Sequence, residues 1–325
     1  MKNTAIGLFT IGLLSATGAT AQSLPDNMYF DGYVEITNLH ATGFTEPFGR
    51  ASLDFGLTPT GGNGLGIGFS LGLDAIHFSD ANLNETAVYP AVTVALGNNG
   101  LLSVGVPRPV LNYGYIPEDT LAHSAGMKVF METAGISQSV TSLAYLFGPF
   151  IFGGDVDVYG LRYDGEFGNT KIGGSYHRIQ TGGGGGDADA YSVAFQHRFG
   201  GISSFADTMV FGGVESVDTG TNTLTSYSLG VEASSDKLRT GLIFSRSDFT
   251  LEIDTINLYA DYKISDRFSV AGSIMHLENG GASANIYGVG LEYQFLNGAY
   301  VNANYSDQDL FGSDAFYEVS LGWRF

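Results

Sequence analysis

Cysteine is absent from the 325-residue sequence, and proline contributes only 8 residues. Without cysteine the chain has no disulfide scaffold, no thiolate zinc site and no cysteine nucleophile. Basic residues are also scarce, because 14 Lys and Arg stand against 33 Asp and Glu and leave a formal charge of −19. A nucleic-acid-binding protein needs a basic face to neutralise phosphates, so the composition excludes that class.

No stretch after residue 21 contains 18 uninterrupted apolar residues, so a hydropathy scan finds no membrane-spanning helix. Yet 44% of the residues are hydrophobic and 14% are charged, which is too apolar for a disordered acidic chain. Glycine is abundant, with 47 residues. Because each glycine costs about 0.5–1 kcal/mol relative to alanine in a helix or strand, the fold needs another strong source of order. A closed ladder of backbone hydrogen bonds in lipid provides one.

Residues 1–21 have the pattern of a secretory signal peptide. Lys2 gives the positive start, residues 5–14 the apolar centre, and residues 19–21 (Ala-Thr-Ala) a small-residue cleavage site. The alternative is a short membrane anchor, but the apolar run has about 10 residues and a spanning helix needs roughly 20. We therefore expect one exported domain, residues 22–325, with a charge of −19 − 1 = −20 after Lys2 is removed.

Alternation of apolar and polar residues is the dominant pattern in this domain, and it is typical of strands with one apolar face. At the C terminus, alternate residues from Tyr317 to Phe325 are apolar and those between them are mostly polar. Two segments, 208–217 and 237–247, alternate poorly and are included partly because the spacing demands them. The sixteen predicted strands span about 28–37, 48–58, 64–74, 86–96, 101–107, 156–167, 170–179, 189–199, 208–217, 223–234, 237–247, 254–264, 267–277, 284–295, 299–306 and 315–325.

The connections between these strands fall into two classes. Several even-numbered connections, such as Gly168–Asn169 and Ser265–Asp266, are very short and consist of hairpin-turn residues. The odd-numbered connections are mostly longer, including 38–47, 75–85, 180–188 and 307–314. Short turns at one rim and longer loops at the other are typical of a transmembrane barrel and not of a sandwich. The connection over 108–155 is far longer than the others, and a loop of that length is usually functional.

Taken together, the mature chain resembles the sixteen-stranded, trimeric general porins of the bacterial outer membrane, particularly the acidic porins of alphaproteobacteria. The resemblance rests on the signal peptide, the strand count, the long fifth connection and the alternating C-terminal strand. It implies an all-β fold, a transmembrane antiparallel β-barrel of 16 strands, in which residues 108–155 fold into the lumen as a constriction loop. It also implies a homotrimer among the lipid and lipopolysaccharide of a Gram-negative outer membrane. Its barrel-assembly machinery would recognise a terminal signal that contains Trp323 and Phe325.

If the apolar faces meet lipid, the opposite faces line water. A charge on the lipid side would cost up to about 2–4 kcal/mol near the bilayer midplane, so charged residues are expected on the inner face. The predicted pore-lining residues are Asp31, Glu35, Asp54, Asp74, Asp164, Lys171, Arg198, Asp261, Lys263 and Glu292.

The resemblance further implies a constriction in which wall arginines face acidic residues of the inserted loop. Arg50 and Arg162 lie on strands where the family carries such arginines, although the third to fifth strands add none. Alternatively, these two arginines tether the loop or pair with acids of the wall. The loop candidates are Glu118, Asp119 and Glu132.

Glycines on the pore face of the third predicted strand have two explanations. Gly64, Gly66, Gly68 and Gly72 either make room for the loop or are simply tolerated in a closed barrel. The segment 68–72 also matches a nucleophile elbow, but it lies within a strand and not at the strand-to-helix turn that the motif requires. The six histidines show no zinc-ligand spacing. We therefore predict no enzyme, no metal site and no cofactor, with calcium at the acidic outer loops as the one candidate ligand.

The sequence thus predicts a porin for the passive diffusion of small hydrophilic solutes and ions. The acidic chain and its few pore-facing basic residues predict a preference for cations. Two other functions stay open: a substrate-specific channel, and, less favoured, an enzyme carried on an outer-membrane barrel.

Overall fold

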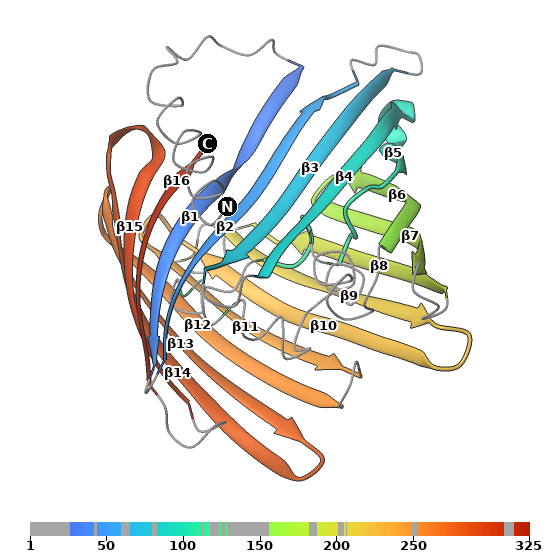
Figure 1. The fold of residues 1–325 in the computed structure, drawn as a ribbon. Coiled ribbons are helices and arrows are strands. Elements are labelled where there is room, and N and C mark those ends of the chain that lie inside the picture. Colours follow the sequence, from blue (N-terminus) through green and yellow to red (C-terminus); the bar gives the residue numbers. More distant parts are fainter. Residues whose placement is uncertain are drawn as a thin grey trace.

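The computed structural model describes residues 27–41, 44–59, 66–79, 83–111, 113–117, 124, 128, 156–181, 187–200, 205, 207–248, 252–308 and 315–325. Within these residues, 16 antiparallel strands form one closed barrel in which each strand pairs with its neighbours in sequence. Figure 1 shows the blue β1 beside the red β16, the pair that closes the barrel. Among the described residues, no helix is long and apolar enough to cross a membrane.

The strands are 9–14 residues long except β5, which has 5. Two short 3-10 helices, η1 (Gly97–Asn99) and η3 (Leu296–Gly298), lie in turns between strands. The strand bounds are β1 (Met28–Ala41), β2 (Phe44–Leu57), β3 (Ile67–Phe78), β4 (Leu83–Ala95), β5 (Leu101–Gly105), β6 (Val156–Phe167), β7 (Thr170–Thr181), β8 (Ala188–Arg198), β9 (Asp207–Asp218), β10 (Thr223–Ser234), β11 (Leu238–Ser247), β12 (Ile253–Ser265), β13 (Phe268–Asn279), β14 (Ala282–Gln294), β15 (Ala299–Gln308) and β16 (Phe316–Arg324).

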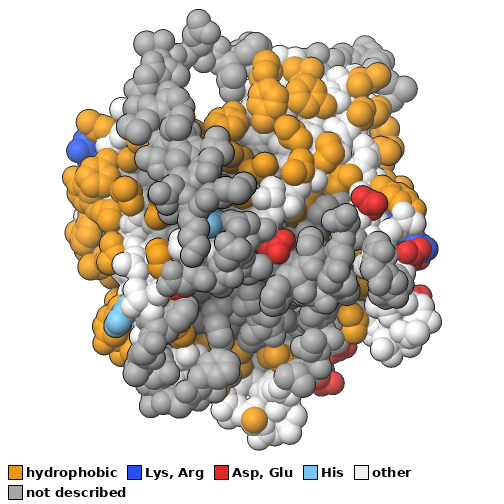
Figure 2. Space-filling model, in the orientation of Figure 1, with side chains coloured by type: hydrophobic (Ala, Val, Ile, Leu, Met, Phe, Trp, Pro, Cys, Tyr) orange, Lys and Arg blue, Asp and Glu red, His pale blue; other side chains and the backbone are white. Residues whose placement is uncertain are grey.

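The two faces of the wall follow from the alternation. On β1, Ile36 points outward and is 42% exposed, whereas its neighbours Glu35 and Thr37 are buried on the lumen side. Large exposed hydrophobic side chains recur in the same way on the other strands, for example Val289 and Leu321. Figure 2 shows hydrophobic side chains gathered on the visible outer wall, with few charged ones among them. The predicted fold, an antiparallel 16-stranded barrel with its apolar face outward, is confirmed.

The prediction of a loop over 38–47 is wrong. β1 and β2 stay paired as far as Ala41 and Phe44, so only residues 42 and 43 separate them. Pro47 fits within β2, and its carbonyl accepts a hydrogen bond from the Ser79 N–H at 3.1 Å, just past the end of β3. In an antiparallel strand the N–H and C=O groups of one residue point toward the same neighbouring strand. The nitrogen of Pro47, which has no hydrogen to donate, therefore faces the end of β3, where the hydrogen-bond ladder has already stopped.

The separation of connections by length is weaker in the structure than the sequence predicted. We call the rim with η1 and Gly168–Asn169 the turn side, and the rim from which the long connection leaves the loop side. Strands extend further toward the loop side than predicted: β3 reaches Phe78 and β4 begins at Leu83. The turn side in turn has two connections that are not short, 58–66 and 199–206. The 106–155 connection therefore distinguishes the two rims better than average loop length does.

Candidate functional site

The long connection after β5 turns into the lumen at its first residues. The Pro107 carbonyl lies 2.7 Å from Nε2 of His177, a buried lumen-side residue of β7. The Val110 N–H donates to Ser175 Oγ at 3.3 Å, and Gln196 Nε2 on β8 donates to the Tyr115 carbonyl at 2.8 Å. Residues 107–111 and 113–117, which we call the loop start, are therefore attached to the inner wall.

Arg108 is the centre of the first cluster of charges. Its Nε donates to Asp54 on β2 at 3.0 Å, and its Nη1 forms an ion pair with Asp74 on β3. The guanidinium also lies against the rings of Tyr89 and Tyr113, 4.5 and 5.0 Å from their centroids. Burial alone would lower the pKa of Arg108, but the two carboxylates outweigh it and hold the pKa above its ordinary value. One loop cation thus bridges two wall acids, and the three groups together carry a charge of −1.

Arg162 on β6 forms the second cluster. It pairs with Asp164 through two hydrogen bonds of 2.8 and 2.6 Å and also donates to the Arg108 and Tyr113 carbonyls at 3.1 and 3.2 Å. Tyr115 donates to the same Asp164 at 3.0 Å, and burial together with this carboxylate raises the pKa of Tyr115. Arg162 therefore tethers the loop and pairs with a wall acid, the two alternatives that the sequence left open.

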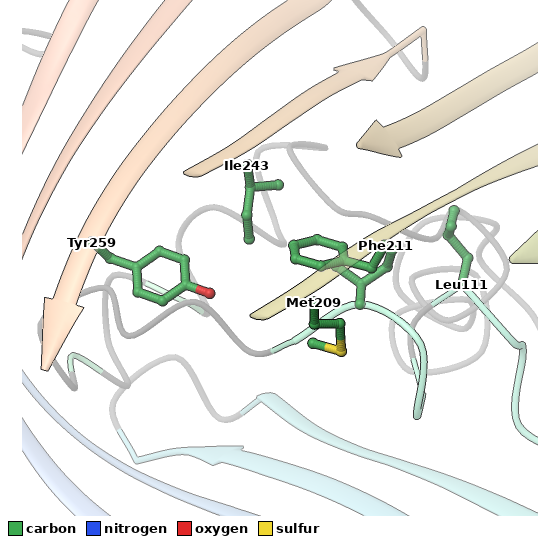
Figure 3. Close-up of a cluster of buried hydrophobic side chains, with 6 residues drawn as sticks. Leu111, Met209, Phe211, Ile243 and Tyr259 are labelled. Atoms are coloured by element: carbon green, nitrogen blue, oxygen red, sulfur yellow. The ribbon is translucent and has the colours of Figure 1, made fainter. Parts of the chain in front are cut away.

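An apolar cluster holds the loop start from the other side. Leu111 and Ile116 of the loop pack with Met209 and Phe211 of β9, with Ile243 of β11 and with Tyr259 of β12. Figure 3 shows the side chains of Met209 and Phe211 between those of Tyr259 and Leu111. All six residues are buried on the lumen side, where water would otherwise be expected. Burying a side chain such as Leu111 contributes about 1.5–3 kcal/mol, so this seat is a substantial anchor.

Glycine on the lumen face makes room for the loop start at three places. A Cβ added to Gly72 would lie 2.7 Å from Arg108 Nε, one added to Gly173 would lie 2.6 Å from the Tyr115 ring, and one added to Gly213 would lie 2.5 Å from Leu111 Cδ1. The same explanation does not apply to Gly68, whose Cβ would meet the Leu57 carbonyl at 2.0 Å. Gly64 lies outside the described residues.

We expect Gly173→Val to displace Tyr115 and to change single-channel conductance, because the valine side chain would occupy the position of the ring. Gly174→Val on the same strand is the matched control, since its Cβ has no neighbour nearer than the Ser192 carbonyl at 3.7 Å. Overpacking of this kind typically costs about 1–3 kcal/mol. Equal conductance of the two variants in a planar bilayer would contradict this role of Gly173.

The loop also reaches the strands that close the barrel. The Ser124 hydroxyl donates to Glu318 on β16 at 2.8 Å, and both residues are buried. Ser320 donates to the other oxygen of Glu318 at 3.2 Å, and its hydroxyl lies 3.0 Å from that of Thr37 on β1. The described residues of the loop therefore contact β2 and β3 at Arg108, β9 at Leu111 and β16 at Ser124, on well-separated parts of the barrel wall.

The structure places the other predicted constriction residues as follows. Arg50 stands opposite Glu35 in the β1–β2 register, with its guanidinium 5.9 Å from the Tyr33 ring. Glu118, Asp119 and Glu132 lie outside the described residues. Arg108 and Tyr113, which the sequence analysis did not select, take central positions. Two pore-facing acids on adjacent strands, Asp54 and Asp74, were the available signal that a cation must lie between them.

The predicted wall residues all occupy lumen-side positions, but in different surroundings. Glu35 accepts from Tyr300 at 2.7 Å, and Glu292 binds Arg324 through hydrogen bonds of 2.7 and 2.6 Å. Arg198 pairs with Asp207, whereas Lys171 and Lys263 are exposed. Of the two residues predicted as the assembly signal, Trp323 pairs with Val34 of β1, and the Phe325 ring lies 4.9 Å from that of Phe30.

The balance of charge at this site is acidic. The side chains of Arg108 and Arg162 are only 9% and 11% exposed, whereas those of Asp74 and Asp164 are 23% and 31% exposed. The two cations are therefore largely covered, and these carboxylates are the more open groups. Among the described residues, no three His, Asp or Glu side chains are grouped so that they could hold a metal ion.

Comparison with known proteins gives a consistent result. The family model for the Gram-negative porin family matches residues 7–323. Among solved structures, a mutant of the Rhodopseudomonas blastica porin is similar at 16% identity and a TM-score of 0.60, covering 92% of this chain and 100% of that one. A loop-deletion mutant of OmpT, an outer membrane protein of Vibrio cholerae, is similar at 16% identity and a TM-score of 0.58, covering 92% and 99%. No curated protein matches the chain in sequence.

Proposed function

The chain belongs to the Gram-negative porin family, and from this premise we propose that it is a cation-preferring channel for the passive diffusion of small hydrophilic solutes and ions. Family and fold point to an outer-membrane channel and not to an enzyme. A barrel of this strand number encloses an aqueous lumen. The loop start narrows that lumen from β2 round to β12.

The observation that carries the cation preference is the covering of the two constriction arginines. Arg108 is neutralised by Asp54 and Asp74, and Arg162 by Asp164. An open arginine cluster would attract anions, but here the guanidinium groups are 9% and 11% exposed, whereas the carboxylates of Asp74 and Asp164 are 23% and 31% exposed. Since the charges that line a pore set its selectivity, cations should pass more readily than anions.

When purified channels in a planar bilayer separate two KCl solutions of different concentration, the proposal predicts a reversal potential whose sign shows that potassium is more permeant than chloride. The preference should weaken as ionic strength rises, because the Debye length falls from about 10 Å at 0.1 M to about 3 Å at 1 M. A reversal potential of zero, or of the sign for chloride, at 0.1 M would refute cation preference while leaving a diffusion channel in place.

The same measurement tests the predicted loop acids. Glu118→Gln with Asp119→Asn should reduce cation preference more than neutralising Asp157 and Asp218, which lie at the loop-side rim. Glu132→Gln belongs to the same series. Equal shifts for the loop and rim variants would remove the loop acids from the proposed constriction.

Other parts of the proposal concern assembly. We propose that residues 1–21 are removed on export, that the barrel is a homotrimer in contact with lipopolysaccharide, and that the last strand with Trp323 and Phe325 is recognised by the barrel-assembly machinery. Calcium at the acidic outer loops stays part of this proposal. A substrate-specific channel is the second candidate function, and solute-blocked, saturable conductance would distinguish it from general diffusion.

A further inference from the structure

Charged residues that face the lumen are distributed unequally along the barrel axis. Within six residues of the loop-side end, no described strand carries a lysine or arginine on its lumen face. The charged side chains of the strands there are all carboxylates, which give five negative charges before the loop cation Arg108, paired with Asp74, is counted. They are Glu46, Asp74, Glu85, Glu215 and Glu318.

The six residues next to the turn side have a mixed composition. Eight acids and six basic residues face the lumen there, so the net charge is 6 − 8 = −2. The acids are Asp31, Asp54, Asp164, Glu166, Asp207, Glu232, Asp261 and Glu292. The basic residues are Arg162, Lys171, Arg198, Arg239, Lys263 and Arg324.

Two of the exposed basic residues differ from the others in having no ion-pair partner among the described residues. Lys171 begins the lumen face of β7 and Lys263 ends that of β12, and both are exposed. Neither forms an ion pair within the described part of the chain, whereas Arg198, Arg239 and Arg324 pair with Asp207, Glu232 and Glu292. Lys171 stands opposite Glu166 in the β6–β7 register, and Lys263 lies two residues from Asp261 on the same face. Neither ammonium group is held by these acids in an ion pair, and both are open to the turn-side mouth.

A pore with unequal fixed charge along its axis conducts unequally in its two directions. The acidic loop-side half concentrates cations and excludes anions, and low-dielectric walls strengthen this effect. A voltage that drives cations from the loop side to the turn side drives anions from the turn side to the loop side. Both kinds of ion then move toward the middle of the pore and accumulate there. The opposite voltage depletes them.

We propose that this channel rectifies, with the larger conductance when cations move from the loop side to the turn side, and that Lys171 and Lys263 are specificity-determining residues of the turn-side mouth. The inference rests on the proposed function, because it requires an open channel, but it does not require the channel to prefer cations.

The test is the ratio of single-channel currents at equal positive and negative voltages in symmetric 0.1 M KCl. We expect a ratio of roughly 1.5, falling toward 1 in 1 M KCl as screening shortens the reach of the wall charges. Because the chain has no cysteine, Asn98→Cys at the exposed, uncharged turn η1 between β4 and β5 gives a unique label in every variant. A membrane-impermeant maleimide added to one side then reports the orientation of each channel.

The variant Lys171→Gln/Lys263→Gln should bring the ratio close to 1, because the turn-side charge changes from −2 to −2 − 2 = −4 and approaches the −5 of the loop-side strands. Lys237→Gln is the matched control, since this lysine lies in a turn and not on the lumen face of a strand, and it should keep the wild-type ratio. A wild-type ratio of 1, or the opposite direction, would overturn the inference, and so would an unchanged ratio in the double variant. A ratio above 1 with no cation preference would instead overturn only the proposed selectivity.

Discussion

Arg108→Gln is expected to raise the preference for cations more than any other single neutralisation in the described wall. The wild-type guanidinium offsets one of the two negative charges of Asp54 and Asp74, and the neutral amide would leave both uncompensated. The local charge of this group changes from −1 to −2, at the narrow part of the lumen. We expect the ratio of potassium to chloride permeability, measured from reversal potentials at 0.1 M KCl, to rise roughly threefold.

The same change should loosen the loop start. Removing one partner of a fully buried ion pair costs about 3–5 kcal/mol, and the cost here is smaller because Asp74, 23% exposed, can be solvated by the pore once its partner is gone. Arg108 also donates to the Leu53 and Leu73 carbonyls at 3.3 and 3.5 Å and contacts two tyrosine rings, and these contacts would be weakened as well. The barrel itself should persist, because its ladder does not include this residue.

Arg178→Gln is the matched control for Arg108→Gln. Arg178 also pairs with two aspartates, Asp187 and Asp189, but it lies on the outer face of β7 at the loop-side rim. The substitution removes the same charge from the same type of cluster without touching the lumen. If both variants shifted the reversal potential equally, net charge and not the position of Arg108 would be responsible, and the prediction would fail.

Period-two alternation predicted most of the fold, and its failures are informative. β9 and β11 alternate poorly because their lumen faces carry Met209, Phe211 and Ile243, which are apolar like their outer faces. These residues face the loop and not water. A prediction that expects polar residues along the whole lumen face gives such strands a weak alternation signal. The irregularity in fact marks the place where the loop packs on the wall.

The sequence predicted the wall of the site better than its loop. Asp54, Asp74, Arg162 and Asp164 were each placed on the lumen face by parity alone, because register with neighbouring strands is not needed for that step. Arg108 was missed because it follows β5 in a segment with no period. Its partners lie 54 and 34 residues away in sequence, on β2 and β3. Only the three-dimensional path of the loop brings these groups together.

Leu111→Asn is expected to increase single-channel conductance and the size limit for solutes by releasing the loop start from its seat. Leu111 is fully buried among Met209, Phe211 and Ile243. Loss of the buried side chain costs about 2–5 kcal/mol, and an amide without a hydrogen-bond partner there adds about 1–3 kcal/mol. Asparagine is neutral, so an altered conductance would not reflect a new charge. We expect an increase of roughly 1.5-fold, since the cross-section of the lumen limits the flow.

Leu111→Met is the control, because it conserves volume in the seat and should cost less than about 1.5 kcal/mol and leave conductance unchanged. A conductance that stayed at the wild-type value in Leu111→Asn, with the barrel intact, would show that the seat does not position the loop.

The double variant with Arg108→Gln separates two further cases. Because both residues hold the same loop start, from opposite sides of the lumen, the second substitution should add little to the first. Full additivity would instead mean that Arg108 and Leu111 hold independent segments, each of which narrows the pore on its own.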